Sequence, residues 1–416
     1  MEKTVGRCEV SGAVEPPCSK SYAQRAMAAA LLCEGESILR NIEFCDDTRY
    51  ALGVIRDLGA ETVQLDAHTL SIIGGLKPET DIINTGESGL AARLFTPIAA
   101  LSDRRITITG KGTMLKRPVG MMLKPLSELG VKAESDGRLP ITVQGPLKGG
   151  ETTVEGSVSS QFTTGLLMAL PLAQEDTILH VDRVYSIPYL AMTINMAHSF
   201  GIRIEHNDHA EYFIESGQKY KPADISIEGD WGSAAFMLVA GAIAGEVTVT
   251  NMNPVSLQAD LGVIEALSRA GASVTITHND ITVARNDLTA FEFDATHSPD
   301  LFPILSVLAA NCEGVSVIKG AKRLIHKESN RAEAILKEFG RIGMEVRIEN
   351  EDYMVVKGQK LKGGIMNSCS DHRIAMAGAV AGLAAYSPVT MLNAEAVNKS
   401  YPRFWDELGY ICSKVI

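Results

Sequence analysis

The chain has 416 residues, of which 45% are hydrophobic and 21% are charged, and its formal net charge at pH 7 is −11. This length favours two domains, and the composition is typical of a globular protein in water. The negative charge argues against a general nucleic-acid-binding protein, although a cleft in an acidic protein can still concentrate positive charge for an anionic small molecule.

The cysteines and the apolar segments indicate in which cellular compartment the protein works. Seven cysteines are scattered without CxxC or Cys/His spacing, so they indicate neither a disulfide framework nor a zinc site and favour a reducing compartment. The N-terminal MEKTVGRCEVSG has no apolar signal core, and runs such as AGAVAGLAAY are broken or too short to span a bilayer. We therefore expect a cytoplasmic protein.

One pattern recurs six times along the chain: a helix-like segment, an apolar residue and glycine, then a strand pattern. It indicates a helix that ends at a C-cap glycine and is followed by a strand. Segments such as RIEHNDHAEYFIES and VTITHNDITVAR add a second strand with period-2 alternation. Six units predict an α/β fold with mixed sheets, in two similar lobes with a cleft between them. The glycines, 66 to 72 residues apart, are Gly59, Gly130, Gly201, Gly271, Gly343 and Gly409.

The first polar interruption of this repeat is PPCSKSYAQRA, directly before the helix-like AMAAALL. Lys20 and Arg25 have the wrong sign for the positive end of a helix dipole. Either this first turn is simply solvated, or an anion binds there through free N–H groups, Ser21 and the two cations.

Four further segments of the first half carry polar residues near predicted helix starts. Ordinary structural roles account for the polar residues of three of them. Ser88 can cap a helix in NTGESGLAARLF, the arginine of KGTMLKRPVGMML can be solvated, and RVYSIPY can form a turn. Capping explains one serine of SSQFTTGLLMALPL, but not its whole polar start. The candidate residues are Gly89, Arg93, Arg117, Ser159, Ser160, Gln161, Ser186 and Tyr189.

The second half has comparable segments. Asp230 and Ser233 in EGDWGSAAFML and Asp300 in THSPDLFPIL suit helix capping, and RLIHKESNRAEAIL suits a surface turn. A charged triplet that opens the apolar helix of SDHRIAMAGAVAGLAAY is harder to explain as surface. Together the cations near helix starts, with Asp300 and Glu328 as acids, predict an interlobe cleft for highly anionic substrates. The other candidates are Lys327, Arg331, Asp371, His372, Arg373 and Lys399.

These segments, in this order along nearly the whole chain, resemble the 3-phosphoshikimate 1-carboxyvinyltransferases, or EPSP synthases. The motifs that carry the resemblance are PCSKSYAQR, SSQFTTGLLMALPLA, SPDLFPILSVLAA, KESNR, DHRIAM and KSYPRFW. It implies an inside-out α/β barrel arrangement with two similar lobes, each of three βαβαββ repeats. Residues 19–228 would form the lobe that mainly binds shikimate 3-phosphate, residues 1–18 plus 229–416 the other, with the active site in the cleft between them.

The resemblance also implies an activity. The enolpyruvyl group of phosphoenolpyruvate would pass to the 5-hydroxyl of shikimate 3-phosphate by addition and elimination, with release of phosphate. This is the step of the shikimate pathway, toward chorismate and the aromatic amino acids, that glyphosate targets. We expect small-molecule substrates, a monomer, no metal or organic cofactor, and no nucleic-acid or membrane partner.

Site residues follow from the matching motif positions, and the resemblance implies four sets. The catalytic residues would be Asp300 as base, Glu328 as proton donor to carbon, and Lys20. Shikimate 3-phosphate would contact Lys20, Ser21, Arg25, Ser159, Ser160, Gln161, Ser186, Asp300 and Lys327. Phosphoenolpyruvate would contact Lys20, Gly89, Arg117, Gln161, Arg331, Arg373 and Lys399. Supporting residues would be Asp230, Asp371 and His372.

Three residues depart from the family pattern. Cys18 stands where glycine is usual, beside the proposed site. Glu87 stands where asparagine is usual, and an added anion there would weaken phosphoenolpyruvate binding unless it turns away. Asn330 replaces the usual aspartate, which we expect to loosen the orientation of Arg331.

Two alternatives stay open. The enolpyruvyl transferase that uses UDP-N-acetylglucosamine shares the fold, but has Lys-Asn where this chain has Lys20-Ser21, and typically a reactive cysteine where this chain reads KGTMLKRP. A non-enzymatic, clamp-like scaffold of six repeats would place cations at equivalent positions of every repeat. Here the cations fall in non-equivalent loops, together with acids.

Overall fold

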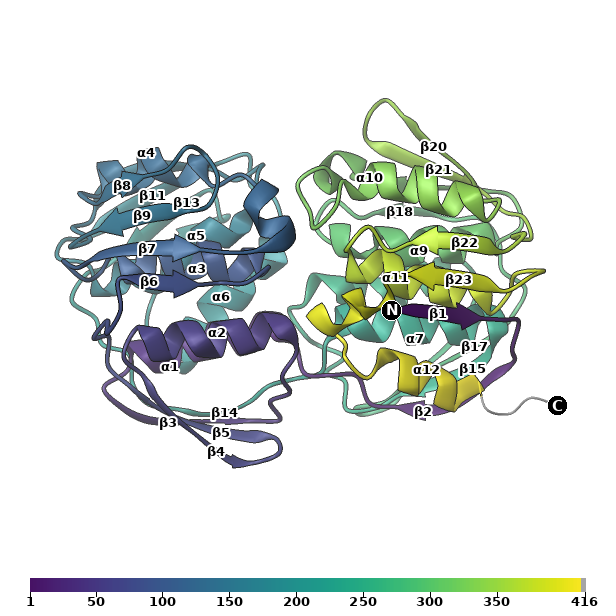
Figure 1. Cartoon of the computed structure of the whole chain (residues 1–416), viewed down its shortest axis with the longest axis horizontal. Helices are drawn as coiled ribbons and strands as arrows, with labels where there is room; N and C mark the ends of the chain where they lie inside the picture. Colours follow the sequence, from purple (N-terminus) through teal and green to yellow (C-terminus); the bar gives the residue numbers. More distant parts are fainter. Residues whose placement is uncertain (413–416) are drawn as a thin grey trace. The chain divides into compact units, whose positions relative to one another are not determined.

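The computed structural model describes residues 1–412 and divides into two compact units. The N-terminal unit is Cys18–Ile227, and the C-terminal unit combines Met1–Pro17 with Glu228–Ile416. The chain start belongs to the second unit because its two strands pair there, as the purple and yellow ribbons of Figure 1 show. β1 (Glu2–Val5) pairs antiparallel with β23 (Val389–Leu392), and β2 (Val10–Val14) pairs parallel with β15 (Gly245–Val249).

The N-terminal unit contains three four-stranded sheets, with the strand orders β14-β3-β5-β4, β6-β7-β9-β8 and β10-β11-β13-β12. In each sheet the first pair is parallel and the other pairs are antiparallel. This order is what a βαβαββ unit produces, except that the first unit takes β14 from the end of the lobe. The elements are α1 (Lys20–Leu32), β3 (Gly35–Arg40), α2 (Asp46–Asp57), β4 (Glu61–Asp66), β5 (Thr69–Gly74), β6 (Ile82–Asn84), α3 (Gly89–Ala99), β7 (Arg105–Thr109), α4 (Leu123–Glu128), β8 (Lys132–Glu134), β9 (Ile141–Gln144), β10 (Gly150–Glu155), α5 (Ser160–Ala169), β11 (Thr177–Asp182), α6 (Ile187–Ser199), β12 (Glu205–Asn207), β13 (Glu211–Ile214) and β14 (Asp224–Ser226).

The C-terminal unit repeats this plan with one variation. Its sheets have the orders β16-β17-β15-β2, β18-β19-β21-β20 and β1-β23-β22. The last sheet has three strands, because β1 takes the place of the hairpin that would end the sixth unit. The remaining elements are α7 (Trp231–Ala244), α8 (Val263–Arg269), β16 (Ser273–Ile276), β17 (Ile281–Ala284), β18 (Glu292–Asp294), α9 (Phe302–Ala310), β19 (Val315–Lys319), α10 (Arg331–Ala334), the π-helical turn η7 (Ile335–Phe339), β20 (Glu345–Glu349), β21 (Tyr353–Lys357), β22 (Gly364–Asn367), α11 (His372–Gly382) and α12 (Phe404–Cys412).

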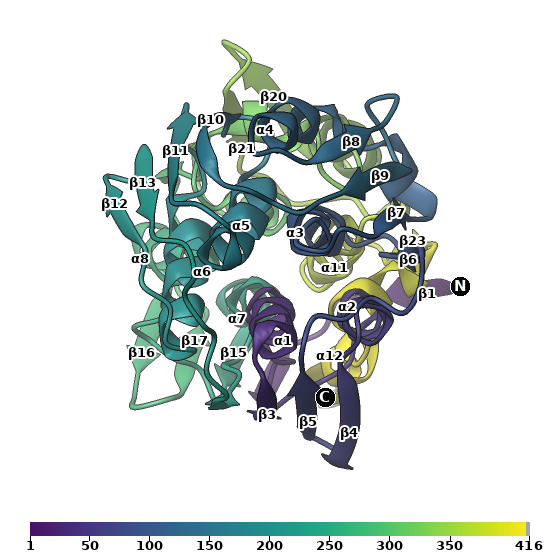
Figure 2. The same ribbon diagram turned by 90° about the vertical axis from the view of Figure 1, so that its left-hand side faces the viewer.

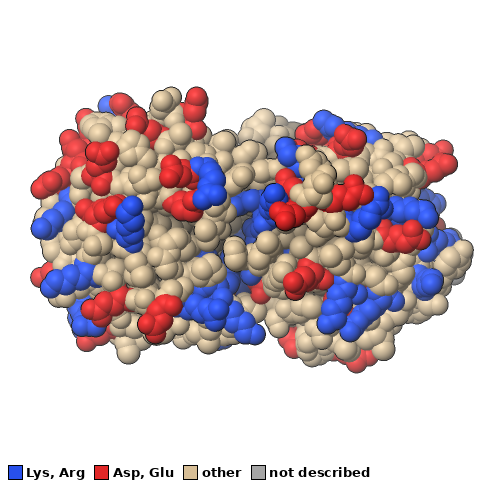
Figure 3. All heavy atoms as spheres, turned by 90° about the horizontal axis from the view of Figure 1, so that it is seen from above, with Lys and Arg blue, Asp and Glu red and all other residues tan. Residues whose placement is uncertain are grey.

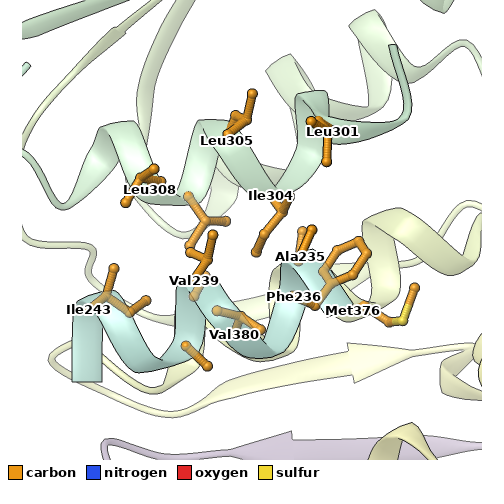
Figure 4. Packing of buried hydrophobic residues seen from close by; sticks show 14 of the residues in the cluster. Ala235, Phe236, Val239, Ile243, Leu301, Ile304, Leu305, Leu308, Met376 and Val380 are labelled. Atoms are coloured by element: carbon orange, nitrogen blue, oxygen red, sulfur yellow. The ribbon is translucent and has the colours of Figure 1, made fainter. Parts of the chain in front are cut away.

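Each unit contains at least one helix that is buried on all sides, and this confirms the expected inside-out arrangement of sheets around helices. Every residue of α3, α7, α9 and α11 is buried. A helix that is apolar all round belongs in a core. Figure 4 shows apolar side chains of α7, α9 and α11 packed together, and Figure 2 shows the strands of the N-terminal unit around its helices. The polar side chains of these inner helices, such as Arg93 and Thr96 of α3 and Ser306 of α9, are therefore buried too.

Five of the six repeat glycines end a helix as the sequence predicts. Gly59, Gly130, Gly201, Gly271 and Gly343 all have positive φ, a conformation that a Cβ disfavours. The expectation for Gly409 is wrong, because α12 continues through it to Cys412. The partner strand comes instead from β1, and the rest of the expected strand lies outside the described residues.

We predict that Leu305→Ala lowers the free energy of unfolding by about 2–5 kcal/mol, because it leaves a cavity in the core. Leu305 is fully buried in α9, whereas Leu257 of the same unit is 39% exposed. Leu257→Ala is therefore the matched control and should change stability by no more than about 0.5 kcal/mol. Urea denaturation followed by circular dichroism measures both variants. Equal losses would contradict the packing described for α9.

Candidate active site

At the start of α1 the cation that seemed misplaced has a carboxylate partner. Lys20 is the first residue of α1, whose N-cap Ser19 accepts from the backbone N–H of Tyr22. Lys20 Nζ donates to Asp47 Oδ2 at 2.9 Å, and both side chains are largely shielded from solvent. Asp47 lies in the first turn of α2, where a carboxylate is ordinary because it suits the helix dipole. Sequence reasoning missed it for that reason.

Arg25 links the start of α1 to two neighbouring helices. Its Nη1 donates to the carbonyl of Ser21 at 2.8 Å, and its Nε donates to Thr193 Oγ1 at 2.9 Å. Its Nη2 donates to Thr164 Oγ1 and to the carbonyl of Tyr189, both at 3.2 Å. Burial lowers the pKa of Arg25 to about 10. The guanidinium thus fixes Ser21 against α5 and α6.

The first turn of α3 is shaped around Arg117. Ser88 caps α3 as expected by accepting from the N–H of Ala91 at 3.2 Å. A Cβ on Gly89 would lie 2.3 Å from Arg117 Nη1 and 2.6 Å from its Cζ. The missing side chain of Gly89 thus leaves the space that the guanidinium occupies, and a Cβ here would force Arg117 to move.

Arg93 joins the Arg117 segment to the polar start of α5. Its Nη2 donates to the carbonyl of Pro118 at 2.8 Å, and its Nη1 donates to Gln161 Oε1 at 2.9 Å. Ser159 caps α5 by accepting from the N–H of Gln161 at 3.2 Å. Gln161 is therefore held from two sides.

Ser186 has a backbone conformation that few residues other than glycine adopt. It is the N-cap of α6 with φ 56° and ψ 40°, in the left-handed region. Such strained residues are concentrated at binding and catalytic sites. Ser160 is the first residue of α5, and both serines are buried.

Two departures from the family pattern have structural explanations. Glu87 Oε2 accepts from the N–H and the Oγ1 of Thr113, at 3.2 and 2.7 Å. Its carboxylate therefore lies against η1 (Gly112–Lys116), the turn that leads to Arg117. Cys18 is buried, and its sulfur accepts from the N–H of Glu43 at 3.2 Å. The thiol thus anchors the loop before α2, which carries Asp47.

In the C-terminal unit, Arg331 lies between three carboxylates. Its Nε donates to Asp371 Oδ2 at 2.7 Å, its Nη1 to Asp300 Oδ1 at 2.6 Å, and its Nη2 to Glu328 Oε2 at 2.8 Å. Burial opposes its charge, but the three carboxylates together raise the pKa of Arg331 well above the usual range. The expectation that Asn330 loosens Arg331 is wrong, because Asp371 makes two bonds to it and Asn330 caps α10 instead.

Asp300 is the common neighbour of three cations and does not cap α9. Its carboxylate lies 2.6 Å from Arg331 Nη1, 3.1 Å from Arg373 Nη2 and 3.2 Å from Lys327 Nζ. Burial lowers the pKa of Lys327, and Asp300 opposes that shift. Asp300, Lys327, Glu328, Arg331, Asp371 and Arg373 form one ionic network, named here the C-terminal cluster.

The supporting residues surround this cluster. Asp371 caps α11 by accepting from the N–H of Arg373 at 3.0 Å, and His372 Nδ1 lies 3.8 Å from Asp371 Oδ1. Asp230 caps α7 by accepting from the N–H of Ser233 at 2.7 Å, as the sequence suggested. Lys399 is buried at the last residue of η8 (Ala394–Lys399), which packs against α11.

The expectation that all the cations lie near helix starts needs one correction. Lys20, Arg331 and Arg373 lie in the first turns of α1, α10 and α11. Arg117 instead follows the last residue of η1, and Lys399 ends η8. Both cations therefore lie at the ends of short 3₁₀ turns, which the helix pattern did not reveal.

Charge on the outer surface is mixed. On the face that Figure 3 shows, Lys and Arg side chains alternate with Asp and Glu, and they form no continuous basic surface. Among residues 1–412, no group of three or more His, Cys, Asp or Glu side chains is arranged to hold a metal ion. None of the helices in the described part of the chain is long and apolar enough to cross a membrane.

Comparisons with known proteins agree with the sequence resemblance. The family model for EPSP synthase (3-phosphoshikimate 1-carboxyvinyltransferase) matches residues 5–408. The chain is 37% identical over 412 residues to a 3-phosphoshikimate 1-carboxyvinyltransferase of Clostridium novyi, covering 96% of this chain and 94% of that protein. It is 37% identical over 410 residues to the protein of the same name from Methanocorpusculum labreanum, covering 97% of each. A solved structure of EPSP synthase from Acinetobacter baumannii superposes with a TM-score of 0.82 at 26% identity, covering 99% of this chain and 98% of that one.

We predict that Asp371→Asn lowers the free energy of unfolding by about 3–5 kcal/mol, because it leaves Arg331 buried with less compensating charge. Asp224→Asn is the matched control, since Asp224 pairs with Arg40 where both side chains are 54% exposed. That change should cost no more than about 1 kcal/mol. Urea denaturation at pH 7 measures both, and a small effect for Asp371→Asn would refute the buried network.

Proposed function

The chain belongs to the EPSP synthase family and is an enolpyruvyl transferase of the shikimate pathway; we propose that it transfers the enolpyruvyl group of phosphoenolpyruvate to the 5-hydroxyl of shikimate 3-phosphate. The observation that carries this activity is the family match over residues 5–408. The roles of individual residues below are our proposals, argued from the chemistry that each position offers.

Shikimate 3-phosphate binds at the helix starts of the N-terminal unit. Ser21, Ser159, Ser160 and Ser186 offer hydroxyls and N–H groups there, which suit a phosphate and a carboxylate. Arg25 already donates hydrogen bonds to four protein acceptors. It acts on the substrate by holding Ser21 in place, or by giving up a hydrogen bond to a threonine hydroxyl and donating to a substrate oxygen instead. Lys20, Gln161, Asp300 and Lys327 complete this set.

Phosphoenolpyruvate binds where backbone and guanidinium groups meet. Arg117 lies against the N–H groups at the start of α3, because Gly89 has no side chain. Those N–H groups and the cation together bind phosphate oxygens. Lys20, Gln161, Arg331, Arg373 and Lys399 supply the further contacts to the phosphate and the carboxylate.

The first chemical step is an addition. Glu328 gives its proton to the methylene carbon of phosphoenolpyruvate, which makes C2 electrophilic, and Asp300 takes the proton of the 5-hydroxyl as its oxygen bonds to C2. In the second step the Glu328 carboxylate takes a proton back from the new methyl group as the C2–O bond to phosphate breaks, which restores the double bond and releases phosphate. Cations stabilise the charge of the tetrahedral intermediate between these steps.

Glu328 must first exchange its partner. Its carboxylate accepts from Arg331 Nη2 at 2.8 Å, and this ion pair favours the charged form that has no proton to give. We propose that the anionic groups of phosphoenolpyruvate attract Arg331, and that the loss of this cation lets Glu328 take up the proton it later transfers. Binding and acid catalysis would then be coupled.

We propose that both units serve one active site, in a cleft between residues 19–228 and residues 1–18 plus 229–416. The argument is chemical: the two substrates carry two phosphates and two carboxylates, and each unit holds cations for some of them. Anionic substrates would attract cations of both lobes at once, so closure should depend on ligand. We further propose a monomer in the cytoplasm, which light scattering and cell fractionation would measure.

The substrate proposal predicts which acceptor supports phosphate release. Purified protein should release phosphate from phosphoenolpyruvate with shikimate 3-phosphate and not with UDP-N-acetylglucosamine. Release with the sugar nucleotide alone would overturn the proposed substrate. Release with neither acceptor would favour the scaffold alternative.

The residue roles predict that Lys20→Ala and Glu328→Ala each lower turnover by about 100-fold or more, through lost charge stabilisation and lost acid catalysis. Lys124→Ala and Glu333→Ala are matched controls at exposed positions of the same two units, and both should keep near wild-type turnover. The phosphate-release assay measures all four. Near wild-type turnover in Glu328→Ala would reject its role as proton donor.

A further inference from the structure

Asp260 is a buried carboxylate beside the C-terminal cluster that none of the roles above uses. It lies in the 3₁₀ turn η4 (Ala259–Gly262) and is 5% exposed. Its Oδ2 is 3.6 Å from Arg373 Nη2, which is an ion pair without a short hydrogen bond. Its Oδ1 is fully buried and has no hydrogen-bond partner among the described residues. A buried, half-satisfied carboxylate is costly, so its presence calls for an explanation.

The first turn of α7 leaves room for this pair. A Cβ on Gly232 would lie 2.5 Å from Asp260 Oδ2 and 2.7 Å from Arg373 Nη2. The carbonyl of Gly232 also accepts from Arg373 Nη1 at 3.2 Å. The absence of a side chain at Gly232 therefore leaves the space in which Asp260 and Arg373 meet, and a Cβ there would displace one of them.

Arg373 is shared between two carboxylates. Its Nη2 lies 3.1 Å from Asp300 Oδ2 as well as 3.6 Å from Asp260 Oδ2, and its Nε has no hydrogen-bond partner among the described residues. The guanidinium thus keeps an N–H that no protein acceptor uses. A ligand anion at Arg373 would compete with both carboxylates for the same charge.

The charged groups around Asp260 place its titration near neutral pH. Burial raises its pKa, Arg373 lowers it, Asp300 and Asp230 raise it, and Lys327 lowers it, which gives a pKa of about 7. These groups belong to α11, to the start of α9, to the cap of α7 and to the loop before α10. A further negative charge nearby would raise this pKa again.

We propose that Asp260 is a positioning residue for Arg373 that takes up a proton when phosphoenolpyruvate binds, so that the guanidinium directs its charge to the substrate anion. This inference rests on the proposed function, because it takes phosphoenolpyruvate as the anion at Arg373. The proton comes from solvent, converts the carboxylate to a carboxylic acid, and returns to solvent when the anionic product leaves. The neutral acid no longer competes with the substrate for Arg373.

The consequence is a pH-dependent affinity. Above pH 7 the ligand-free protein holds Asp260 ionised, so binding must include protonation and weakens as pH rises. We expect the KM for phosphoenolpyruvate of the wild type to rise on the order of tenfold between pH 6.5 and 8.5 at saturating shikimate 3-phosphate. Asp260→Asn has a permanently neutral side chain of the same shape. Its KM should stay near the low-pH value of the wild type, with a kcat within a few-fold.

Three outcomes would overturn the inference. A wild-type KM that is flat across this range does so without any variant. The inference is also overturned if the KM of Asp260→Asn rises with pH as steeply as that of the wild type. It is overturned too if the KM of Asp260→Asn is raised equally at every pH, which is what a purely structural role predicts. Asp294→Asn is the matched control, since Asp294 pairs with Lys319 at an exposed position of the same unit, and it should keep the slope. Failure of the proposed function would look different, as absence of phosphate release at every pH.

Discussion

The complete burial of the inner helices is the constraint on which the other features of this structure depend. α3, α7, α9 and α11 have no solvent-facing side, so every polar side chain they carry is buried, including those of their first turns. A charge at such a turn is itself buried and must be paired. The ionic network of Arg331 with Asp300, Glu328 and Asp371 is the solution to that constraint in the C-terminal unit. The residues of this network thus stabilise the fold and are also the ones we propose for catalysis and binding.

Much of the fold was predictable because its signals are local. A helix that ends in a left-handed turn requires glycine, and five of the six glycines with regular spacing have positive φ. The prediction for Gly409 was wrong because pairing of β1 with β23 replaces the last hairpin. That pairing joins the two ends of the chain, and no local pattern in the sixth repeat reveals a strand supplied from the first residues.

At the candidate site, helix caps were predictable from the sequence, but the side-chain partners of the charged residues were not. Capping by Ser88, Ser159, Asp230 and Asp371 follows from short polar side chains before apolar runs. The acceptors of Arg25 lie 139 and 168 residues away in α5 and α6, on threonines that sequence alone does not distinguish from core threonines. The sequence around Asp260 did not indicate a functional residue for the same reason, since only the fold brings Asp260 close to Arg373.

Carboxylates that pair the cations of the proposed site explain how an acidic protein can bury so many positive charges. Lys20 pairs with Asp47, and Arg331 and Arg373 share Asp300. Without these partners, clustered cations would repel one another and destabilise the fold. When the cations are paired, the binding free energy of a ligand is only the difference between its own contacts and the carboxylate contacts it displaces. A ligand with several negative charges is favoured over one with a single charge, because only the former replaces enough internal carboxylates at once. If these residues form the substrate site as we propose, selectivity for substrates that carry both a phosphate and a carboxylate follows from the same pairing that stabilises the ligand-free protein.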